Sequence, residues 1–102
     1  MIIAMLPGAA VTKVRPAVVI ASTRCLLERP DVIVGILTTR IPAPLASTDY
    51  ALLDWQTAGL RAPSCFRAYV LTLHRSETTL IGHLSDRDWT QVNARVRLTF
   101  DV

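Results

Sequence analysis

Short runs of apolar, often β-branched residues recur along the chain, separated by polar or proline-containing segments. This pattern favours β-strands, because β-branched side chains pack well on a pleated surface and runs of about four to eight residues are short for helices. Residues 17–22 (AVVIAS) and 32–39 (VIVGILTT) are almost continuously apolar, which is typical of strands buried on both faces. Gly35 within the second run predicts a bulge or a close backbone approach.

Further strands are predicted at residues 2–6, 50–53, 64–73 and 79–84. Between the strands, helical turns are predicted at residues 25–28 and 54–58, and Gly59 closes the second of them. The prolines in residues 41–47 predict an irregular loop.

The C-terminal segment is the one with a helical period, and we predict a helix over residues 86–99. Ser85 is a suitable N-cap, with Asp88 in the capping-box position three residues later. We interpret Asp86 and Asp88 as acidic residues that favour the helix dipole, not as a catalytic carboxylate pair. The apolar positions that define the period are Trp89, Val92, Val96 and Phe100.

Five to seven short strands with one terminal helix predict a mainly β fold, a small closed barrel that forms a single domain over residues 1–102. The chain is 51% hydrophobic and only 19% charged, which excludes intrinsic disorder. A chain this short and this apolar also favours a dimer, because a dimer interface would extend the small core.

The net charge is +3, and arginine carries almost all of the excess, because Lys13 is the only lysine. Arginine suits phosphate, since its planar fork donates two parallel hydrogen bonds, so a nucleic-acid partner gains some plausibility. The two cysteines define neither a disulfide framework nor a zinc site. No apolar run is long enough to span a membrane, and residues 1–10 have no basic leader, so we expect a cytoplasmic protein.

Arg15 is the first candidate for chemistry. Pro16 restricts its backbone to an extended conformation at the entrance to the apolar strand, where an arginine can stabilise charge that develops on a phosphate. A surface arginine that caps a strand is the alternative, and composition alone favours it. Thr38 and Thr39 end the second core strand beside Arg40 and could hold a phosphate oxygen, although threonine is also simply common in strands.

The remaining candidates give weaker signals. Ser64 and Arg67 share a predicted strand but face opposite sides of it unless a bulge intervenes. Histidine can act as an acid or base near neutral pH, but neither His74 nor His83 has a companion residue at ligand spacing. For Cys25 and Cys65 we favour a packing role over a nucleophilic one. The large aromatic residues are expected to pack in the core or at an interface, and they are Trp55, Phe66, Tyr69 and Trp89.

Several segments, in order, resemble the MazF/PemK family of toxin–antitoxin ribonucleases over nearly the whole chain. An apolar first strand with a Pro-Gly turn (MLPG) precedes KVRPAVVI at residues 13–20 and the strand at residues 32–39. AGL at residues 58–60 and Pro63-Ser64 follow, and then IGHLS at residues 81–85 opens the last helix. The Arg-Pro-Ala-Val-Val and Ile-Gly-x-Leu-Ser steps are the most specific parts.

The resemblance implies an SH3-like barrel with a C-terminal α-helix that works as a homodimer and is bound by a cognate antitoxin protein. It implies a cytoplasmic, metal-independent endoribonuclease without a cofactor, which cuts single-stranded RNA and leaves a cyclic phosphate and a free 5′ hydroxyl. Arg15 falls on the family's catalytic arginine and Thr38 on its catalytic threonine. The residues expected to bind RNA are Lys13, Thr39, Arg40, Ser64 and Arg67.

Two alternatives remain open at this point, because a fold does not fix a function. The chain could be an inactive relative that still pairs with an antitoxin, or a gyrase poison, which is a function known on this fold in related toxins. A structural or assembly role has only the apolar composition to support it.

Overall fold

The computed structural model of the protein describes residues 2–7 and 14–102. Six strands form one antiparallel sheet in the order β4-β5-β3-β2-β1-β6. The strands are β1 (Ile2–Pro7), β2 (Val14–Val19), β3 (Asp31–Thr38), β4 (Tyr50–Ala51), β5 (Cys65–His74) and β6 (Thr79–His83). The helices are α1 (Thr23–Glu28), the short 3-10 helix η1 (Arg75–Glu77) and α2 (Asp86–Thr99).

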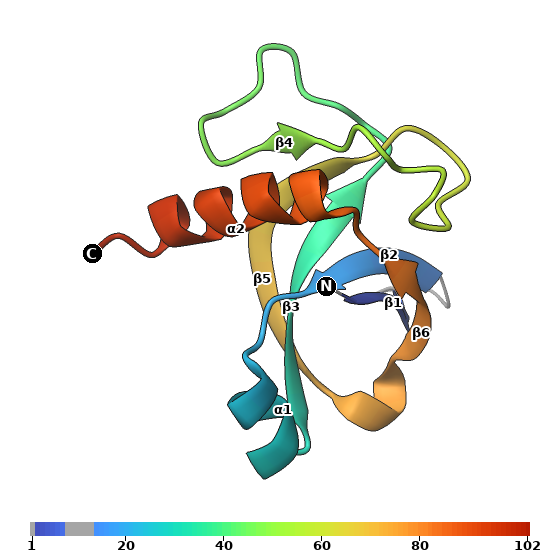
Figure 1. Ribbon diagram of the computed structural model, residues 1–102, viewed down its shortest axis with the longest axis vertical. Coiled ribbons are helices and arrows are strands. Elements are labelled where there is room, and N and C mark those ends of the chain that lie inside the picture. Colours follow the sequence, from blue (N-terminus) through green and yellow to red (C-terminus); the bar gives the residue numbers. More distant parts are fainter. Residues whose placement is uncertain (1, 8–13) are drawn as a thin grey trace.

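The sheet curls strongly, and α2 lies across β5 near its upper end (Figure 1). The predicted fold class, a barrel-like β fold with a C-terminal helix, is confirmed. The sheet is nevertheless open, because no ladder between described residues joins its two end strands, β4 and β6. The prediction of a closed barrel is wrong in that respect, and β4, with only two paired residues, offers little edge for closure.

Helix α2 has the predicted bounds, and the Ser85 hydroxyl accepts a hydrogen bond from the Asp88 amide as an N-cap. Helix α1 begins two residues earlier than predicted, because β2 already ends at Val19 and Ser22 caps the helix by accepting from the Cys25 amide. The turn after Asp54 is closed at Gly59, whose φ of 95° lies in the left-handed region that favours glycine.

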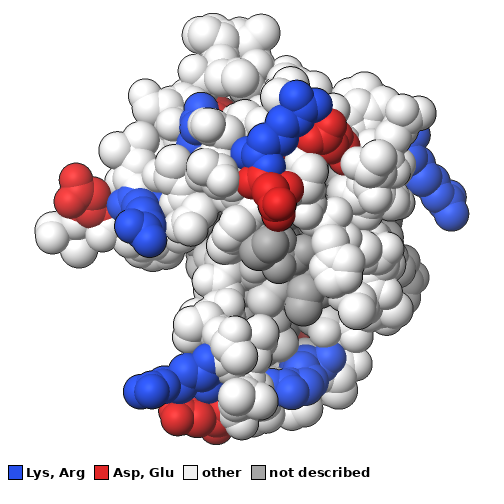
Figure 2. All heavy atoms as spheres, in the orientation of Figure 1, with Lys and Arg blue, Asp and Glu red and all other residues white. Residues whose placement is uncertain are grey.

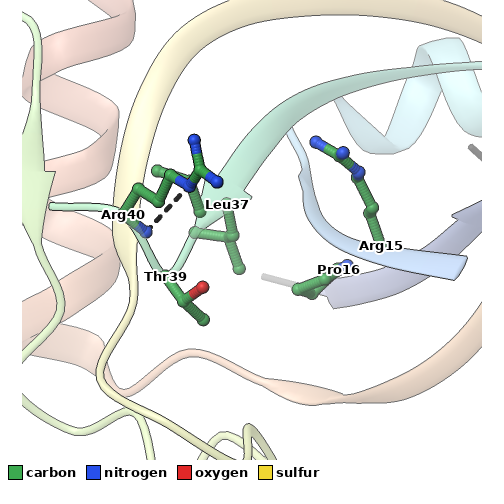
Figure 3. A pocket seen from close by; sticks show the side chains of 6 residues that line it. Arg15, Pro16, Leu37, Thr39 and Arg40 are labelled. Atoms are coloured by element: carbon green, nitrogen blue, oxygen red, sulfur yellow. Dashed lines mark hydrogen bonds between the residues drawn. The ribbon is translucent and has the colours of Figure 1, made fainter. Parts of the chain in front are cut away.

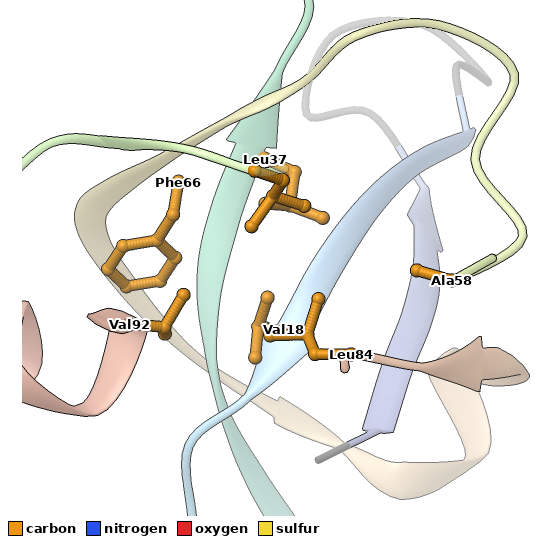
Figure 4. Close-up of a cluster of buried hydrophobic side chains, with 7 residues drawn as sticks. Val18, Leu37, Ala58, Phe66, Leu84 and Val92 are labelled. Atoms are coloured by element: carbon orange, nitrogen blue, oxygen red, sulfur yellow. The ribbon is translucent and has the colours of Figure 1, made fainter. Parts of the chain in front are cut away.

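The main core lies between the concave face of the sheet and α2 (Figure 4). Phe66 from β5 and Val92 from α2 are both fully buried in it. Gly35 makes room for Phe66, since a Cβ at Gly35 would lie 2.5 Å from the aromatic ring. The β3–β5 register also shifts between Gly35 and Ile36, so the predicted bulge and close approach are both confirmed. The buried members are Val18, Leu37, Leu52, Ala58, Phe66, Leu84 and Val92.

A second, smaller cluster packs on the other face of the sheet. Its buried members alternate along β2 and β3 with those of the main core, as a two-residue strand period requires. The prediction that these two strands are buried on both faces is therefore confirmed. The buried residues of this cluster are Ala17, Val19, Val32 and Val34.

Candidate functional site at the β2–β3 strand ends

The register of two central strands brings the first two candidates together. Strands β2 and β3 are antiparallel, with Ala17 paired to Ile36 and Val19 to Val34. Continuing this register by two residues brings Arg15 opposite Thr38. Directly opposite residues in an antiparallel pair have Cβ atoms about 5 Å apart and project from the same face. An arginine at the start of one strand thus faces a threonine at the end of its neighbour.

A pocket of about 420 Å³ opens at these two strand ends. Figure 3 shows the side chains of Arg15 and Arg40 on either side of Leu37, with Pro16 and Thr39 below them. Both arginines are exposed, whereas Leu37 is buried and forms the apolar floor. The structure therefore brings together Arg15, Thr38, Thr39 and Arg40 from the predicted site. The lining residues are Arg15, Pro16, Leu37, Thr38, Thr39 and Arg40.

The Thr38 hydroxyl is held by the backbone that follows it. Its Oγ1 accepts a hydrogen bond of 3.1 Å from the Arg40 amide, drawn as a dashed line in Figure 3. An accepting hydroxyl keeps its own proton for donation, so Thr38 can donate to an oxygen that enters the pocket. Neither Arg15 nor Arg40 forms an ion pair among the described residues. The pocket therefore offers two cationic forks and an oriented hydroxyl to an anion.

On the face shown in Figure 2, basic side chains lie apart from one another, and several are next to acidic ones. The pocket itself carries two arginines, on a chain whose net charge is only +3. Such an arrangement suits a phosphate group better than a long electrostatic track.

Ser64 and Arg67 were also predicted to contact RNA, and the structure places them apart. Ser64 is 2% exposed and its hydroxyl donates to the Ala62 carbonyl, so it presents no hydroxyl at the surface. Arg67 is partly exposed and pairs with Ile36, which places it on the same face as Thr38. The bulge in β5 falls after Arg67, where two extra residues precede Val70, and so it does not unite Arg67 with Ser64.

Both histidines lie far from the pocket along their strands. His74 pairs with Asp31 at the opposite end of the eight-residue strand β3, roughly 20 Å from Thr38 for an extended chain. His83 pairs with Ile2, whereas Arg15 pairs with Leu6 near the other end of β1. The chemistry of the pocket therefore rests on arginine and hydroxyl groups. Lys13, the remaining predicted contact, lies outside the described residues.

Cys65 and most of the large aromatic residues pack as predicted, whereas Cys25 is only half-buried. Cys65 is fully buried, and burial raises the pKa of its thiol, which disfavours the nucleophilic thiolate. Phe66 is in the main core, and Trp55 and Trp89 pack against it. Tyr69 is different: 60% of it is exposed, so it does not lie in the core, and interface packing of this residue stays a prediction.

Asp88 has a role beyond the helix dipole. Its side chain is fully buried and accepts three hydrogen bonds from the segment around β4. The Tyr50 hydroxyl donates to it at 2.7 Å, and the amides of Leu53 and Asp54 donate at 3.1 and 2.8 Å. Asp88 thereby fastens the chain after β4 to the first turn of α2, a role for which the sequence carries no local signal.

Asp54 joins the same junction from the other side. Both oxygens of its carboxylate accept from Arg87, at 2.7 and 2.6 Å, and one also accepts from the Ser85 hydroxyl. The hydrogen bonds from Arg87 and Ser85 lower the pKa of Asp54 to about 2. The N-terminal turn of α2 and the turn after β4 are therefore held together by reciprocal contacts of two carboxylates.

Tyr50 should make the stability of this junction sensitive to alkali. Burial and the hydrogen bond to Asp88 raise the pKa of Tyr50 to about 12, above its ordinary value of 10.0. A pKa raised on folding stabilises the fold below the unfolded value, so this contribution should be present below pH 10 and lost as pH rises toward 12. Ultraviolet titration of a Tyr69→Phe variant, in which Tyr50 is the only tyrosine, measures the pKa directly. Titration near pH 10 would contradict the hydrogen bond to Asp88.

Metal-binding and membrane-spanning features are both missing from the described part of the chain. Its residues contain no group of three or more His, Cys, Asp or Glu side chains arranged to hold a metal ion. Within the same residues, no helix has the length and apolar character needed to cross a membrane.

An antiparallel sheet with a cationic pocket at its strand ends and a helix across it defines a small β-fold protein suited to binding an anion. The family model of the PemK-like, MazF-like toxin of type II toxin–antitoxin systems matches residues 2–100. The chain therefore belongs to the PemK/MazF toxin family and is a MazF-like toxin of a toxin–antitoxin system. No curated protein sequence matches the chain.

Solved structures share the fold over nearly their whole lengths. Mycobacterium tuberculosis toxin MazF-mt6 superposes with a TM-score of 0.80 at 18% identity, covering 100% of this chain and 98% of that one. A mycobacterial endoribonuclease, solved in complex with its cognate antitoxin, gives a TM-score of 0.83 at 14% identity, covering 99% of this chain and 92% of that one. At these identities the likeness concerns the fold.

Proposed function

We propose that this toxin is a metal-independent endoribonuclease that cuts single-stranded RNA at short specific sequences. The observation that supports it most is the placement of Arg15 opposite Thr38 at a pocket that opens to solvent at the strand ends. Single-stranded RNA suits the reaction, because the 2′ hydroxyl must reach in-line geometry on its neighbouring phosphate, and a flexible strand can do so.

The reaction needs only charge stabilisation and proton transfer. The 2′ oxygen forms a bond to phosphorus and loses its proton to solvent, while the bond from phosphorus to the 5′ oxygen breaks. The products are a 2′,3′-cyclic phosphate and a 5′ hydroxyl, whose oxygen takes up a proton. In this proposal Arg15 binds the non-bridging oxygens, on which negative charge develops, and gives a proton to the leaving oxygen, which it regains from solvent.

Thr38 complements this role from the facing strand. With its Oγ1 anchored by the Arg40 amide, its hydroxyl proton points to a phosphate oxygen without any reorganisation at the moment of reaction. Arg40 and Thr39 lie beside it and bind the phosphate of the same or the next nucleotide. Arg67 extends the contact surface on the same face, and Lys13 precedes Arg15 in sequence. The buried hydroxyl of Ser64 has no part in this proposal.

Two protein partners belong to the proposal. A cognate antitoxin is supported by the family and by the related mycobacterial endoribonuclease, which was solved with its own antitoxin. An acidic, extended antitoxin segment would complement the two arginines of the pocket. A homodimer is supported by the exposed apolar side chains near the end of α2, among them Leu98 and Phe100.

Incubation of the purified protein with single-stranded RNA in excess EDTA tests the activity. We expect cleavage at a recurring short sequence, with the rate unchanged by the chelator, because the pocket supplies its positive charge from arginine. A DNA gyrase supercoiling assay is the matched comparison. Inhibition of gyrase by a protein that leaves RNA intact would assign the chain to the gyrase-poison alternative.

A further inference from the structure

Arg67 and Tyr69 form a preformed pair on the exposed face of β5. The guanidinium carbon of Arg67 lies 4.5 Å from the centroid of the Tyr69 ring, and Nη2 of Arg67 donates to the Tyr69 hydroxyl at 3.0 Å. Asp49, which is 6% exposed, holds the other side of Arg67, with Oδ1 at 3.8 Å from Nε. Arg67 covers one face of the ring, and Tyr69 nevertheless remains 60% exposed.

We propose that the Arg67–Tyr69 pair is a nucleobase-binding subsite, in which the free face of Tyr69 stacks on a base next to the phosphate held at Arg15 and Thr38. This inference rests on the proposed function, since it names how the RNA is gripped beside that pocket. Base stacking on an aromatic ring contributes affinity without needing a particular base, and an adjacent guanidinium strengthens it.

The position of the pair fits a neighbouring nucleotide. Thr38 pairs with Cys65 on β5, and Ile36 pairs with Arg67 two residues further along. Arg67 is therefore on the strand next to Thr38 and is displaced along it by one side-chain repeat, roughly 7 Å. Tyr69 is two residues further along β5, and its ring reaches back to Arg67. The bulge after Arg67 adds two residues to β5 opposite the Gly35–Ile36 step, and Tyr69 is one of them. A bulge commonly redirects a side chain out of the regular ladder, which is consistent with the exposure of Tyr69.

The chemistry of this face favours RNA over a protein segment. Asp49 pairs with Arg67, so the net positive charge beside this face comes from Arg15 and Arg40 at the pocket, which suit the phosphates of a nucleic-acid strand. The ring is held in place by its hydrogen bond to Arg67, so little side-chain entropy is lost when a flat ligand stacks on it. Leu71, the next side chain on this face, is 45% exposed and extends the apolar strip for the base beyond it.

The test uses an RNA oligonucleotide that contains the cleavage sequence mapped with the wild-type protein and carries a 2′-O-methyl group at the cut site. We expect Tyr69→Ala to weaken binding about 5- to 100-fold, whereas Tyr69→Phe, which keeps the ring, stays within about threefold. Removing one base next to the cut site should weaken binding to the wild type by a similar factor. The same abasic RNA should bind Tyr69→Ala no more weakly than intact RNA does, because the stacking partner is already absent.

The cleavage kinetics separate stacking from a general structural effect. Tyr69→Ala should raise KM and leave kcat at saturating RNA nearly unchanged, since the reacting atoms lie at Arg15 and Thr38. Equal RNA affinity of Tyr69→Ala and the wild type would overturn the subsite. So would an antitoxin affinity that falls in this variant while RNA affinity does not. A wild-type protein that neither binds nor cuts RNA would instead overturn the proposed function itself.

Discussion

Replacing Arg15 with alanine should lower the rate of RNA cleavage at saturating substrate by at least about 10³-fold, the scale on which an arginine stabilises a phosphoryl transition state. The Arg15 side chain lines the pocket, and the register of β2 and β3 brings Arg15 opposite Thr38. Arg15→Lys keeps the charge but loses the planar fork, so it should recover only part of the rate.

Single-turnover cleavage of a labelled oligonucleotide measures this effect without interference from product release. Arg24→Ala is a suitable control, because Arg24 is an exposed arginine on α1 that does not line the pocket. Its cleavage rate should remain that of the wild type. Arg15 is exposed, so its removal should leave the thermal unfolding midpoint almost unchanged. Persistent cleavage by a folded Arg15→Ala protein would exclude the role given to this residue.

Asp88→Ala should lower the free energy of unfolding by about 4 kcal/mol, because three donors lose a charged acceptor and a buried space remains. This is a large share of the roughly 5–15 kcal/mol that stabilises a typical domain. The donors are the Tyr50 hydroxyl and two backbone amides that follow β4. The segment between β4 and β5 should therefore exchange its amide hydrogens faster even in conditions where the variant remains folded.

Urea denaturation measures the change, and Asp86→Asn provides a matched control. Asp86 stands in the same first turn of α2 but is exposed, so its substitution should cost no more than about 0.5 kcal/mol. If Asp88 served only the helix dipole, the two substitutions would have similar effects. Equal destabilisation by the two variants would therefore contradict the role of Asp88 as an acceptor for the β4 segment.

The strands and the terminal helix could be predicted because their signals are local. Continuous apolar runs rich in β-branched residues mark β2 and β3, and the Ser85 cap with its helical period marks α2. Gly35 could be assigned to a bulge because a glycine weakens an apolar strand and commonly marks such an irregularity. The candidate pocket was predicted through resemblance, since nothing in the sequence states that Arg15 faces Thr38. That depends on the antiparallel register of β2 and β3.

The features that the sequence did not reveal depend on contacts between distant segments. Asp88 stands where helix-start aspartates are common, and only the packing of α2 against β4 shows that its carboxylate is fully buried. For Tyr69, packing is the natural prediction because large aromatic residues usually are buried, but the residue is 60% exposed and its ring lies against Arg67. The open sheet edge likewise follows from the shortness of β4, where the Leu53 amide binds Asp88 instead of extending the ladder.

The chemical ends of the RNA fragments test the proposed reaction of this pocket most directly. If the 2′ hydroxyl attacks the phosphate held between Arg15 and Thr38, mass spectrometry of a cleaved oligonucleotide should find a 2′,3′-cyclic phosphate on one fragment and a 5′ hydroxyl on the other. A substrate with 2′-deoxyribose at the cut site should remain intact. Fragments that carry a 5′ phosphate and a 3′ hydroxyl, or cleavage of the deoxy substrate, would contradict this mechanism.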